Sequence, residues 1–300
     1  MPAREQIGVI GLGIMGSAMA VNLVAAGFSV VGYDILERRR AVLSRSRGRV
    51  ARSARDLAGR ARIVITSLPS AEALGDVAAE LVATGNRGQI VIETSTLPIA
   101  VKEQARQTLA KRRVTLLDCP LSGTGAQARV KDLAVYASGS RSAYRRSIPV
   151  LEGFARAHYF LGPFGAGSKM KFVANLLVAI HNVSTAEALV LGMKAGLDPA
   201  MMVKVLGDGA GSSRMLQVRG PMMVKGDYSE AAMKVGVWQK DMKIIGEFAR
   251  ELDCPTPLFA ATVPIYNTAM GLGFADSDTA SVCAVLEKWA TPAGRNRRRP

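Results

Sequence analysis

The stretch Ile7-Gly-Val-Ile-Gly-Leu-Gly-Ile-Met-Gly16 decides the fold of this chain. It starts as a short apolar run and continues as G-x-G-x-x-G, and the following residues 17–26 place apolar side chains at helical spacing. This loop between a strand and a helix is the signature of a dinucleotide-binding unit. Gly11 permits a tight turn, Gly13 lets the backbone approach a pyrophosphate, and Gly16 lets the helix pack on the strand. Free N–H groups at the helix start then face the phosphates. We therefore predict that the loop binds the cofactor through Gly11, Leu12, Gly13, Ile14, Met15 and Gly16.

An acidic residue closes the next apolar run. Asp34 follows Val30–Tyr33 and lies 18 residues after Gly16. A carboxylate at that position accepts the adenosine ribose hydroxyls and repels a 2′-phosphate, which predicts a preference for NAD. Arg38, Arg39 and Arg40 begin about one helical turn later, where a cationic clamp for a 2′-phosphate can form, so NADP stays open as a cofactor.

Short β-branched runs alternate with helical patterns through the first half of the chain, which predicts an α/β fold with a doubly wound parallel sheet of Rossmann type. The runs lie at 7–10, 30–33, 63–68, 89–92 and 114–117, and the helical patterns at 17–26, 37–43 and 99–111. We expect two further runs, 133–137 and 158–161, to extend the same sheet.

The second half of the chain has helical patterns only. Residues 168–195 predict a helix of about 25 residues or more, and further helices are expected at 199–207, 231–252, 256–272 and 278–290, punctuated by glycines and by prolines that include Pro221. The predicted organisation is a dinucleotide-binding Rossmann domain at 1–165, an all-helical domain for substrate binding and oligomerisation at 166–290, and a basic disordered tail at 291–300.

The net charge of +15 is concentrated in two places. Residues 37–62 hold ten arginines and only two acids, and the last ten residues add four arginines. Such charge is compatible with a non-catalytic nucleic-acid-binding protein. However, residues 37–62 contain no Phe, Tyr or Trp to stack on bases. The favoured interpretation is therefore a solvated basic face, and we expect no nucleic acid as partner. Nucleic-acid binding through residues 37–62 is kept as the alternative function.

The cysteines and the apolar stretches argue against three other classes of protein. Three widely spaced cysteines without a C-x-x-C pair fit neither a disulfide scaffold nor a thiolate zinc site, and they favour the reducing cytoplasm. No cluster of His or acidic residues has metal-ligand spacing, so no metal is expected. Polar residues interrupt the longest apolar stretch, 172–193, which argues against a membrane span and membrane partners.

Five stretches in order resemble the β-hydroxyacid dehydrogenase family, which includes enzymes for 3-hydroxyisobutyrate, tartronate semialdehyde and L-threonate. They cover nearly the whole chain, about residues 6–290. These stretches are Gly8–Gly16 continuing to Asn22-Leu23, Thr66-Ser-Leu-Pro69, Glu93-Thr-Ser-Thr96, Asp118-Cys-Pro-Leu-Ser-Gly-Thr124 and Gly167-x-x-x-Lys171-x-x-x-Asn175, followed by a Lys240-Asp241 pair.

The resemblance implies a role for each stretch. Leu68 and Pro69 would line the cofactor, and Ser95 and Thr96 would lie near the nicotinamide. Ser122, Gly123 and Thr124 would bind the substrate, whereas Lys171 and Asn175 would be both catalytic and substrate-binding. Lys240 would reach the cofactor site from the helical domain. The chain departs from the family pattern at Thr124, which replaces a glycine, at Lys131-Asp132, which replaces Gly-Thr, and at Ala174, which replaces an asparagine.

These residues permit a hydride-transfer reaction without a metal. Lys171 and Asn175 are spaced i, i+4, so they share one helix face. A lysine beside a carbonyl oxygen can donate a proton to that oxygen, and the neutral amine can take the proton back from a hydroxyl. Together with the family resemblance, these residues lead us to expect an NAD(P)-dependent 3-hydroxyacid dehydrogenase. The long apolar helical half resembles that of family members that form dimers or tetramers, which implies a homo-oligomer. Imine reduction on the same fold is an alternative, although imine-specialised relatives usually lack this lysine. Decarboxylating sugar-phosphate relatives, of the 6-phosphogluconate dehydrogenase kind, have much longer chains.

Overall fold

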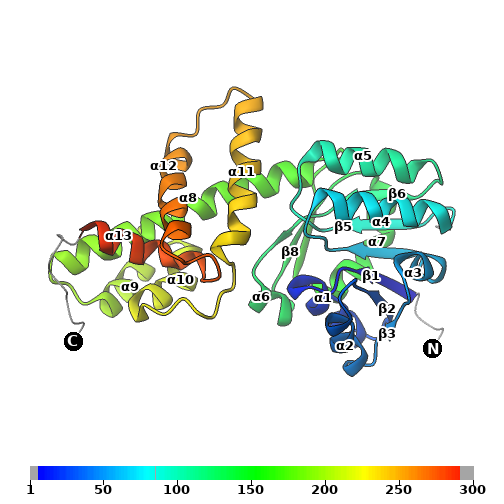
Figure 1. Ribbon diagram of the computed structural model, residues 1–300, viewed down its shortest axis with the longest axis horizontal. Coiled ribbons are helices and arrows are strands. Elements are labelled where there is room, and N and C mark those ends of the chain that lie inside the picture. The colour runs from blue at the N-terminus through cyan, green and yellow to red at the C-terminus, as the bar shows by residue number, and fades with distance from the viewer. Residues whose placement is uncertain (1–5, 85, 291–300) are drawn as a thin grey trace. The chain divides into compact units, whose positions relative to one another are not determined.

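The computed structural model describes residues 6–84 and 86–290, and its contacts divide the chain into two compact units (Figure 1). The first unit ends at Lys171, and the second begins at Phe172. Both units share one helix, α8, because it starts at Ala166 and runs through this boundary. The basic tail predicted at 291–300 lies outside the described residues.

A six-stranded parallel sheet forms the centre of the first unit and confirms the predicted Rossmann fold. Its strand order is β3-β2-β1-β4-β5-β6. The strands are β1 (Gln6–Ile10), β2 (Ser29–Tyr33), β3 (Arg49–Val50), β4 (Ile63–Thr66), β5 (Ile90–Glu93) and β6 (Thr115–Asp118). The direction of winding reverses between β1 and β4, and ligands bind such sheets at the carboxyl ends of the strands beside this reversal.

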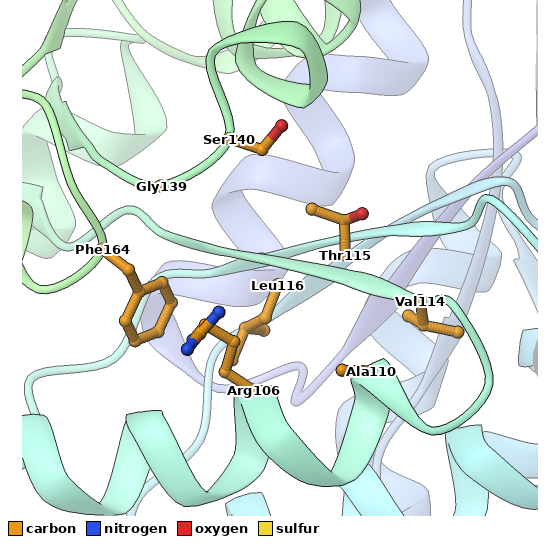
Figure 2. A pocket seen from close by; sticks show the side chains of 8 residues that line it. All are labelled: Arg106, Ala110, Val114, Thr115, Leu116, Gly139, Ser140 and Phe164. Carbon is orange, nitrogen blue, oxygen red and sulfur yellow. The ribbon is translucent and has the colours of Figure 1, made fainter.

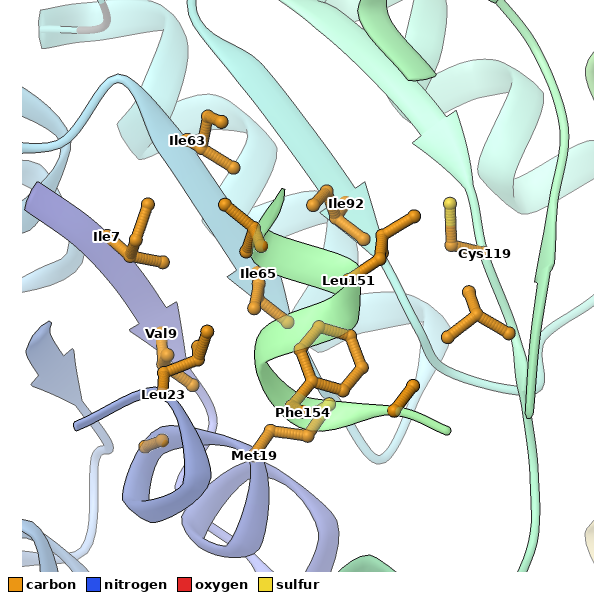
Figure 3. Close-up of a cluster of buried hydrophobic side chains, with 14 of the residues drawn as sticks. Ile7, Val9, Met19, Leu23, Ile63, Ile65, Ile92, Cys119, Leu151 and Phe154 are labelled. Carbon is orange, nitrogen blue, oxygen red and sulfur yellow. The ribbon is translucent and has the colours of Figure 1, made fainter. Parts of the chain in front are cut away.

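Successive residues of each strand point to opposite faces of the sheet and supply two separate cores. Ile7 and Val9 pack on one face with Leu23 and Phe154 (Figure 3). The other face is covered by α3, α4 and α5. The helices of this unit are α1 (Ile14–Ala25), α2 (Glu37–Arg45), α3 (Ala54–Arg60), α4 (Ala71–Thr84), α5 (Ile99–Ala110), α6 (Gly125–Arg129) and α7 (Arg141–Phe154). The sequence patterns did not predict α3, α4, α6 or α7.

The prediction that 133–137 and 158–161 extend the central sheet is wrong. They form β8 (Ala134–Ala137) and β9 (Ala157–Phe160), which build a separate three-stranded sheet with β7 (Leu121–Ser122). The chain turns back after β6, so β7 pairs antiparallel with β8. A single bridge between Asp118 and Ser138 connects β6 to the end of β8.

The second unit is helical, as predicted. It contains most of α8 (Ala166–Lys194) together with α9 (Pro199–Asp208), α10 (Arg214–Lys225), α11 (Val235–Glu251), α12 (Pro257–Gly271), the 3₁₀ turn η1 (Thr279–Ser281) and α13 (Val282–Ala290). Pro221 does not separate helices as expected, because α10 runs through it. The helix is capped at its start by the side chain of Ser213 and ends at Gly226 in a left-handed conformation.

Helix α8 is long and apolar enough to cross a membrane by length and composition alone, which is weak evidence because the core helix of a globular protein passes the same test. Its polar residues support the core assignment. Asn182 is fully buried and donates hydrogen bonds to the Tyr266 hydroxyl (3.0 Å) and the Thr279 carbonyl (2.9 Å) within the same unit.

Candidate active site

The glycine loop between β1 and α1 has the geometry of a phosphate cradle. Gly11 adopts φ +89°, and a Cβ there would lie 2.1 Å from the Ser67 carbonyl oxygen. A Cβ at Gly16 would lie 1.8 Å from the Gly11 oxygen, so only glycine allows this close packing. In contrast, the space above Gly13 is open, with the Arg39 guanidinium 4.0 Å from a Cβ placed there. Helix α1 starts without a side-chain cap or an acidic first turn, so its free N–H groups fit a dinucleotide pyrophosphate.

Asp34 lies directly beneath this loop. Its carboxylate is buried and accepts hydrogen bonds from the backbone N–H groups of Leu12 and Leu36, both at 2.8 Å. The Arg39 guanidinium lies 3.4 Å from the same carboxylate and is partly exposed. Arg40 donates to the Asp34 carbonyl oxygen and stacks over the Tyr33 ring. Asp34 therefore holds the glycine loop in place, and Arg39 is the arginine that pairs with its carboxylate.

The loops that follow β4 and β5 meet beside the glycine loop. The Ser67 N–H donates to the Ile10 carbonyl at 2.9 Å, which fixes the β4 loop against the end of β1. The Leu68 N–H donates to the Ser95 hydroxyl at 2.8 Å. Pro69 is exposed and Thr96 is half-buried. These contacts bring together the β4 and β5 segments that the sequence assigned to cofactor binding.

The turn formed by Ser122, Gly123 and Thr124 leads from β7 into α6. Gly123 adopts φ +129°, as a tight turn requires. The Thr124 side chain caps α6 in a reciprocal arrangement with Gln127, whose side-chain oxygen accepts the Thr124 N–H at 3.0 Å. The Thr124 hydroxyl also lies 3.3 Å from that oxygen. The Thr124 side chain, which departs from the family pattern, is thus engaged within its own turn, and all three residues of the turn are half-buried.

Lys171 and Asn175 lie one helical turn apart on α8. Lys171 is half-buried, whereas Asn175 is buried and donates to the Asp241 carboxylate at 2.9 Å. The Lys240 ammonium lies 3.5 Å from the other oxygen of Asp241. Within the helical unit, Asp241 therefore links the predicted site residues Asn175 and Lys240.

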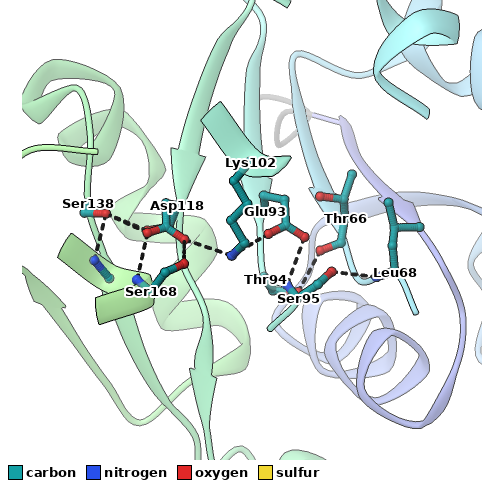
Figure 4. A network of polar contacts seen from close by, with 10 residues as sticks. Thr66, Leu68, Glu93, Thr94, Ser95, Lys102, Asp118, Ser138 and Ser168 are labelled. Carbon is teal, nitrogen blue, oxygen red and sulfur yellow. Dashed lines mark hydrogen bonds and ion pairs between the residues drawn. The ribbon is translucent and has the colours of Figure 1, made fainter. Parts of the chain in front are cut away.

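A buried polar network was not predicted from the sequence (Figure 4). Lys102 on α5 has no exposed surface, and its ammonium lies 2.7 Å from Glu93 and 2.9 Å from Asp118, at the ends of β5 and β6. Ser168 in the first turn of α8 donates to Asp118 through both its N–H and its hydroxyl, each at 2.8 Å. The sequence pattern around Lys102 is that of a solvent-exposed helix. The buried network was therefore indicated only by two acids, Glu93 and Asp118, that each end a buried apolar run.

Two further observations concern other kinds of site. Among residues 6–84 and 86–290, no group of three or more His, Cys, Asp or Glu side chains is placed to hold a metal ion.

A cavity of about 370 Å³ lies beside edge strand β6, lined by Arg106, Ser140 and Phe164 among others (Figure 2). None of the predicted site residues lines it, so it is separate from the glycine loop.

Two family models match the chain. Residues 6–162 match the NAD binding domain of 6-phosphogluconate dehydrogenase, and residues 165–286 match the NAD-binding domain of NADP-dependent 3-hydroxyisobutyrate dehydrogenase. The L-threonate dehydrogenase of Cupriavidus necator is 34% identical over 289 residues, which cover 94% of this chain and 96% of that protein. The 2-(hydroxymethyl)glutarate dehydrogenase of Eubacterium barkeri is 28% identical over 292 residues, covering 96% and 97%. The crystal structure of 3-hydroxyisobutyrate dehydrogenase from Salmonella typhimurium matches with a TM-score of 0.86 and 29% identity, covering 94% of this chain and 99% of that one.

The chain belongs to the β-hydroxyacid dehydrogenase family, which confirms the resemblance carried by its motifs. It is an NAD(P)-dependent oxidoreductase of the hydroxyacid dehydrogenase class. The comparisons support this function over imine reduction and over nucleic-acid binding.

Proposed function

We propose that the protein interconverts a small β-hydroxy acid of the L-threonate or 3-hydroxyisobutyrate type with its β-oxo acid or semialdehyde, with Lys171 as general acid and base. One observation carries this assignment of Lys171. Ser168 is bonded twice to Asp118 at the carboxyl end of β6, so the first turn of α8 is held at the strand ends where Rossmann sheets bind their ligands. Lys171 follows Ser168 by three residues, within the same compact unit.

The residues of this chain supply the proton and orient the substrate. A bound nicotinamide cofactor would supply the acceptor or the donor of the hydride at the hydroxyl-bearing carbon. The Lys171 ammonium donates a proton to the carbonyl oxygen as that oxygen becomes a hydroxyl, and the neutral amine accepts the proton in the oxidation direction. Asn175 is oriented by Asp241, which leaves its second amide hydrogen for the same oxygen or the substrate carboxylate.

The substrate carboxylate is proposed to bind the Ser122 hydroxyl and the Gly123 N–H. Thr124 takes part by shaping the turn, because both its hydroxyl and its N–H are engaged by Gln127. For Lys240, whose ammonium lies 3.5 Å from Asp241, the support is the match to the family's Lys-Asp pair. This arrangement suits an acid with one carboxylate, since Ser122 and Gly123 offer a short turn rather than a second cationic pocket.

The cofactor is proposed to bind through the glycine loop, Leu68, Pro69, Ser95 and Thr96, with NAD preferred over NADP. The Asp34 carboxylate supports that preference because its charge repels a 2′-phosphate. We also propose a homo-oligomer that works in the cytoplasm. Exposed apolar residues on α8, among them Val173, Leu177 and Leu191, support the oligomer because exposed apolar surface is where a second copy of the chain can pack.

A cofactor-reduction screen tests the proposed function. Purified protein is supplied with NAD or NADP and with L-threonate, 3-hydroxyisobutyrate or glycerate, and reduced cofactor is measured by absorbance. We expect turnover of at least one acid with NAD. Binding of NADH without turnover of any of these acids, or faster reduction of a cyclic imine than oxidation of any acid, would contradict the proposal.

A further inference from the structure

The network around Lys102 joins the ends of two neighbouring strands inside the first unit (Figure 4). Lys102, Glu93 and Asp118 each have no measurable exposed surface. One ammonium thus lies between two carboxylates, at 2.7 Å and 2.9 Å. Burial acts to lower the pKa of Lys102, but attraction to Glu93 and Asp118 outweighs burial and raises that pKa above its ordinary value. Lys102 is therefore charged, and its single ammonium is shared between two carboxyl groups.

Stability alone is a weak explanation for such a group. Removing ions from water is costly, and well-packed apolar residues of similar volume often serve a protein core equally well. The more informative feature is what the two carboxylates bind besides Lys102.

On one side, the network reaches the proposed cofactor loops. The second oxygen of Glu93 accepts the Ser95 N–H at 2.9 Å, and the Ser95 hydroxyl accepts the Leu68 N–H at 2.8 Å. The loops after β4 and β5 are thereby tied to one carboxylate.

On the other side, the network reaches the start of α8. Asp118 accepts both hydrogen bonds from Ser168. The Ser138 hydroxyl donates to Asp118 at 3.1 Å and accepts the Gly167 N–H at 2.9 Å. A Cβ at Gly167 would lie 2.2 Å from the Tyr136 carbonyl oxygen, so this turn has little room to shift.

We propose that Lys102 is a positioning residue for the reaction. Through Glu93 and Asp118, it fixes the position of the loop at Ser95 relative to the helical turn that carries Lys171. The inference rests on the proposed function, in which this loop and Lys171 act on the same substrate. Without the ammonium, Glu93 and Asp118 are two buried carboxyl groups on neighbouring strands with no cation between them, so one of them takes up a proton or moves away. Either change loosens the hold on Ser95 or on Ser168.

Hydrogen exchange measured by mass spectrometry tests the structural part of the inference without any substrate. In Lys102→Met, we expect faster amide exchange in peptides covering both 66–70 and 166–171. The matched control is Arg219→Met, which breaks the buried ion pair of Arg219 with Asp278 in the helical unit (3.1 Å). This control should speed exchange around Asp278 and leave both segments unchanged. Faster exchange in only one segment, or equal changes in both variants, would overturn the inference.

Kinetics test the functional part. For Lys102→Met we expect kcat per folded molecule to fall by about 100-fold, the size expected from a misplacement of about 1 Å. The deuterium isotope effect on kcat should rise, because slower hydride transfer becomes rate-limiting. A merely structural defect reduces the folded fraction and leaves KM and the isotope effect unchanged, and that result would contradict the inference.

A milder variant decides the matter if Lys102→Met does not fold. Ser168→Ala removes one hydrogen bond to Asp118 and keeps the backbone bond. We expect it to fold, to speed exchange at 166–171, and to lower kcat about 3- to 10-fold, in line with the loss of about 1 kcal/mol. An unchanged kcat with unchanged exchange would contradict the inference. If instead no acid is turned over, the proposed function fails, while the exchange measurement still decides whether Lys102 couples the two segments.

Discussion

Both units of the protein bury a cation against carboxylates, and the two arrangements differ in what they connect. In the helical unit, Arg219 meets Asp278, which also accepts the backbone N–H groups of Ala232, Met233 and Ala280. One cation balances one anion there, and the group ties α10 to the turn before α13. In the nucleotide-binding unit, one ammonium, that of Lys102, lies between two acids. Glu93 also binds Ser95 in a loop proposed to bind the cofactor, and Asp118 also binds Ser168 in the helical turn that carries Lys171. The comparison suggests that the first group serves stability and the second serves the site.

Asp278→Ala should have the largest effect on stability, because it leaves the buried Arg219 and three backbone N–H groups without their acceptor. We expect the free energy of unfolding to fall by about 3–5 kcal/mol, measured by thermal or urea denaturation. Asp276→Ala is the matched control, since that carboxylate is 92% exposed in its ion pair with Lys234. Its effect should stay below about 1 kcal/mol. Equal losses of stability in the two variants would contradict the claim that the Arg219–Asp278 group stabilises the helical unit.

In the nucleotide-binding unit, Gly16→Ala should have the largest effect on NADH binding, since its Cβ would lie 1.8 Å from the Gly11 oxygen. We expect NADH affinity, measured by fluorescence titration, to fall by at least about tenfold, equivalent to ~1.4 kcal/mol. Gly59→Ala in α3 is the control, because no atom lies within 4 Å of its added Cβ. It should bind NADH normally and be as stable as the parent or slightly more so. Normal NADH binding by Gly16→Ala would show that the loop does not cradle the cofactor.

Asp34→Asn tests whether the charge of Asp34 sets the preference for NAD over NADP. The amide can still accept one of the two backbone hydrogen bonds, but it no longer repels a 2′-phosphate beside Arg39. We expect the ratio of kcat/KM for NADP to that for NAD to rise by about tenfold, or ~1.4 kcal/mol. If the parent protein already prefers NADP, the repulsion attributed to Asp34 is absent.

Tyr266→Phe should have the smallest effect and one that depends on pH. Burial raises the pKa of Tyr266 to about 12, so the folded protein keeps its phenol protonated at a pH where the unfolded chain has lost the proton. The stability that the neutral phenol contributes is complete below the unfolded pKa of about 10. It is lost as the pH rises toward 12. At neutral pH the variant should be about 1 kcal/mol less stable, because Asn182 loses its hydrogen bond. The difference should shrink above pH ~10 in denaturation experiments, and a constant difference would contradict this account.

The elements predicted well from the sequence are those with strong local signals. The glycine loop follows a buried strand, and α8 has a long uninterrupted helical pattern, so both were evident. The placement of 133–137 in a second sheet was not, because it depends on the antiparallel return at Leu121–Ser122, only two residues long. Lys102 was missed for a similar reason. Its partners are 9 and 16 residues away in sequence and meet it only through the packing of α5 on the sheet. The turn at Thr124 was predicted from the sequence, whereas the capping of this turn by Gln127 is evident only in the folded structure.

The most direct test of the account is the replacement of Lys171. Lys171→Ala should lower kcat by about 10²–10⁴-fold, the usual contribution of general acid–base catalysis, while the Kd for NADH measured by fluorescence stays within about twofold. The pH dependence of the remaining activity should lose the ionisation that belongs to the lysine. Turnover at the rate of the parent protein, with NADH still bound, would contradict the assignment of Lys171 and with it the proposed mechanism.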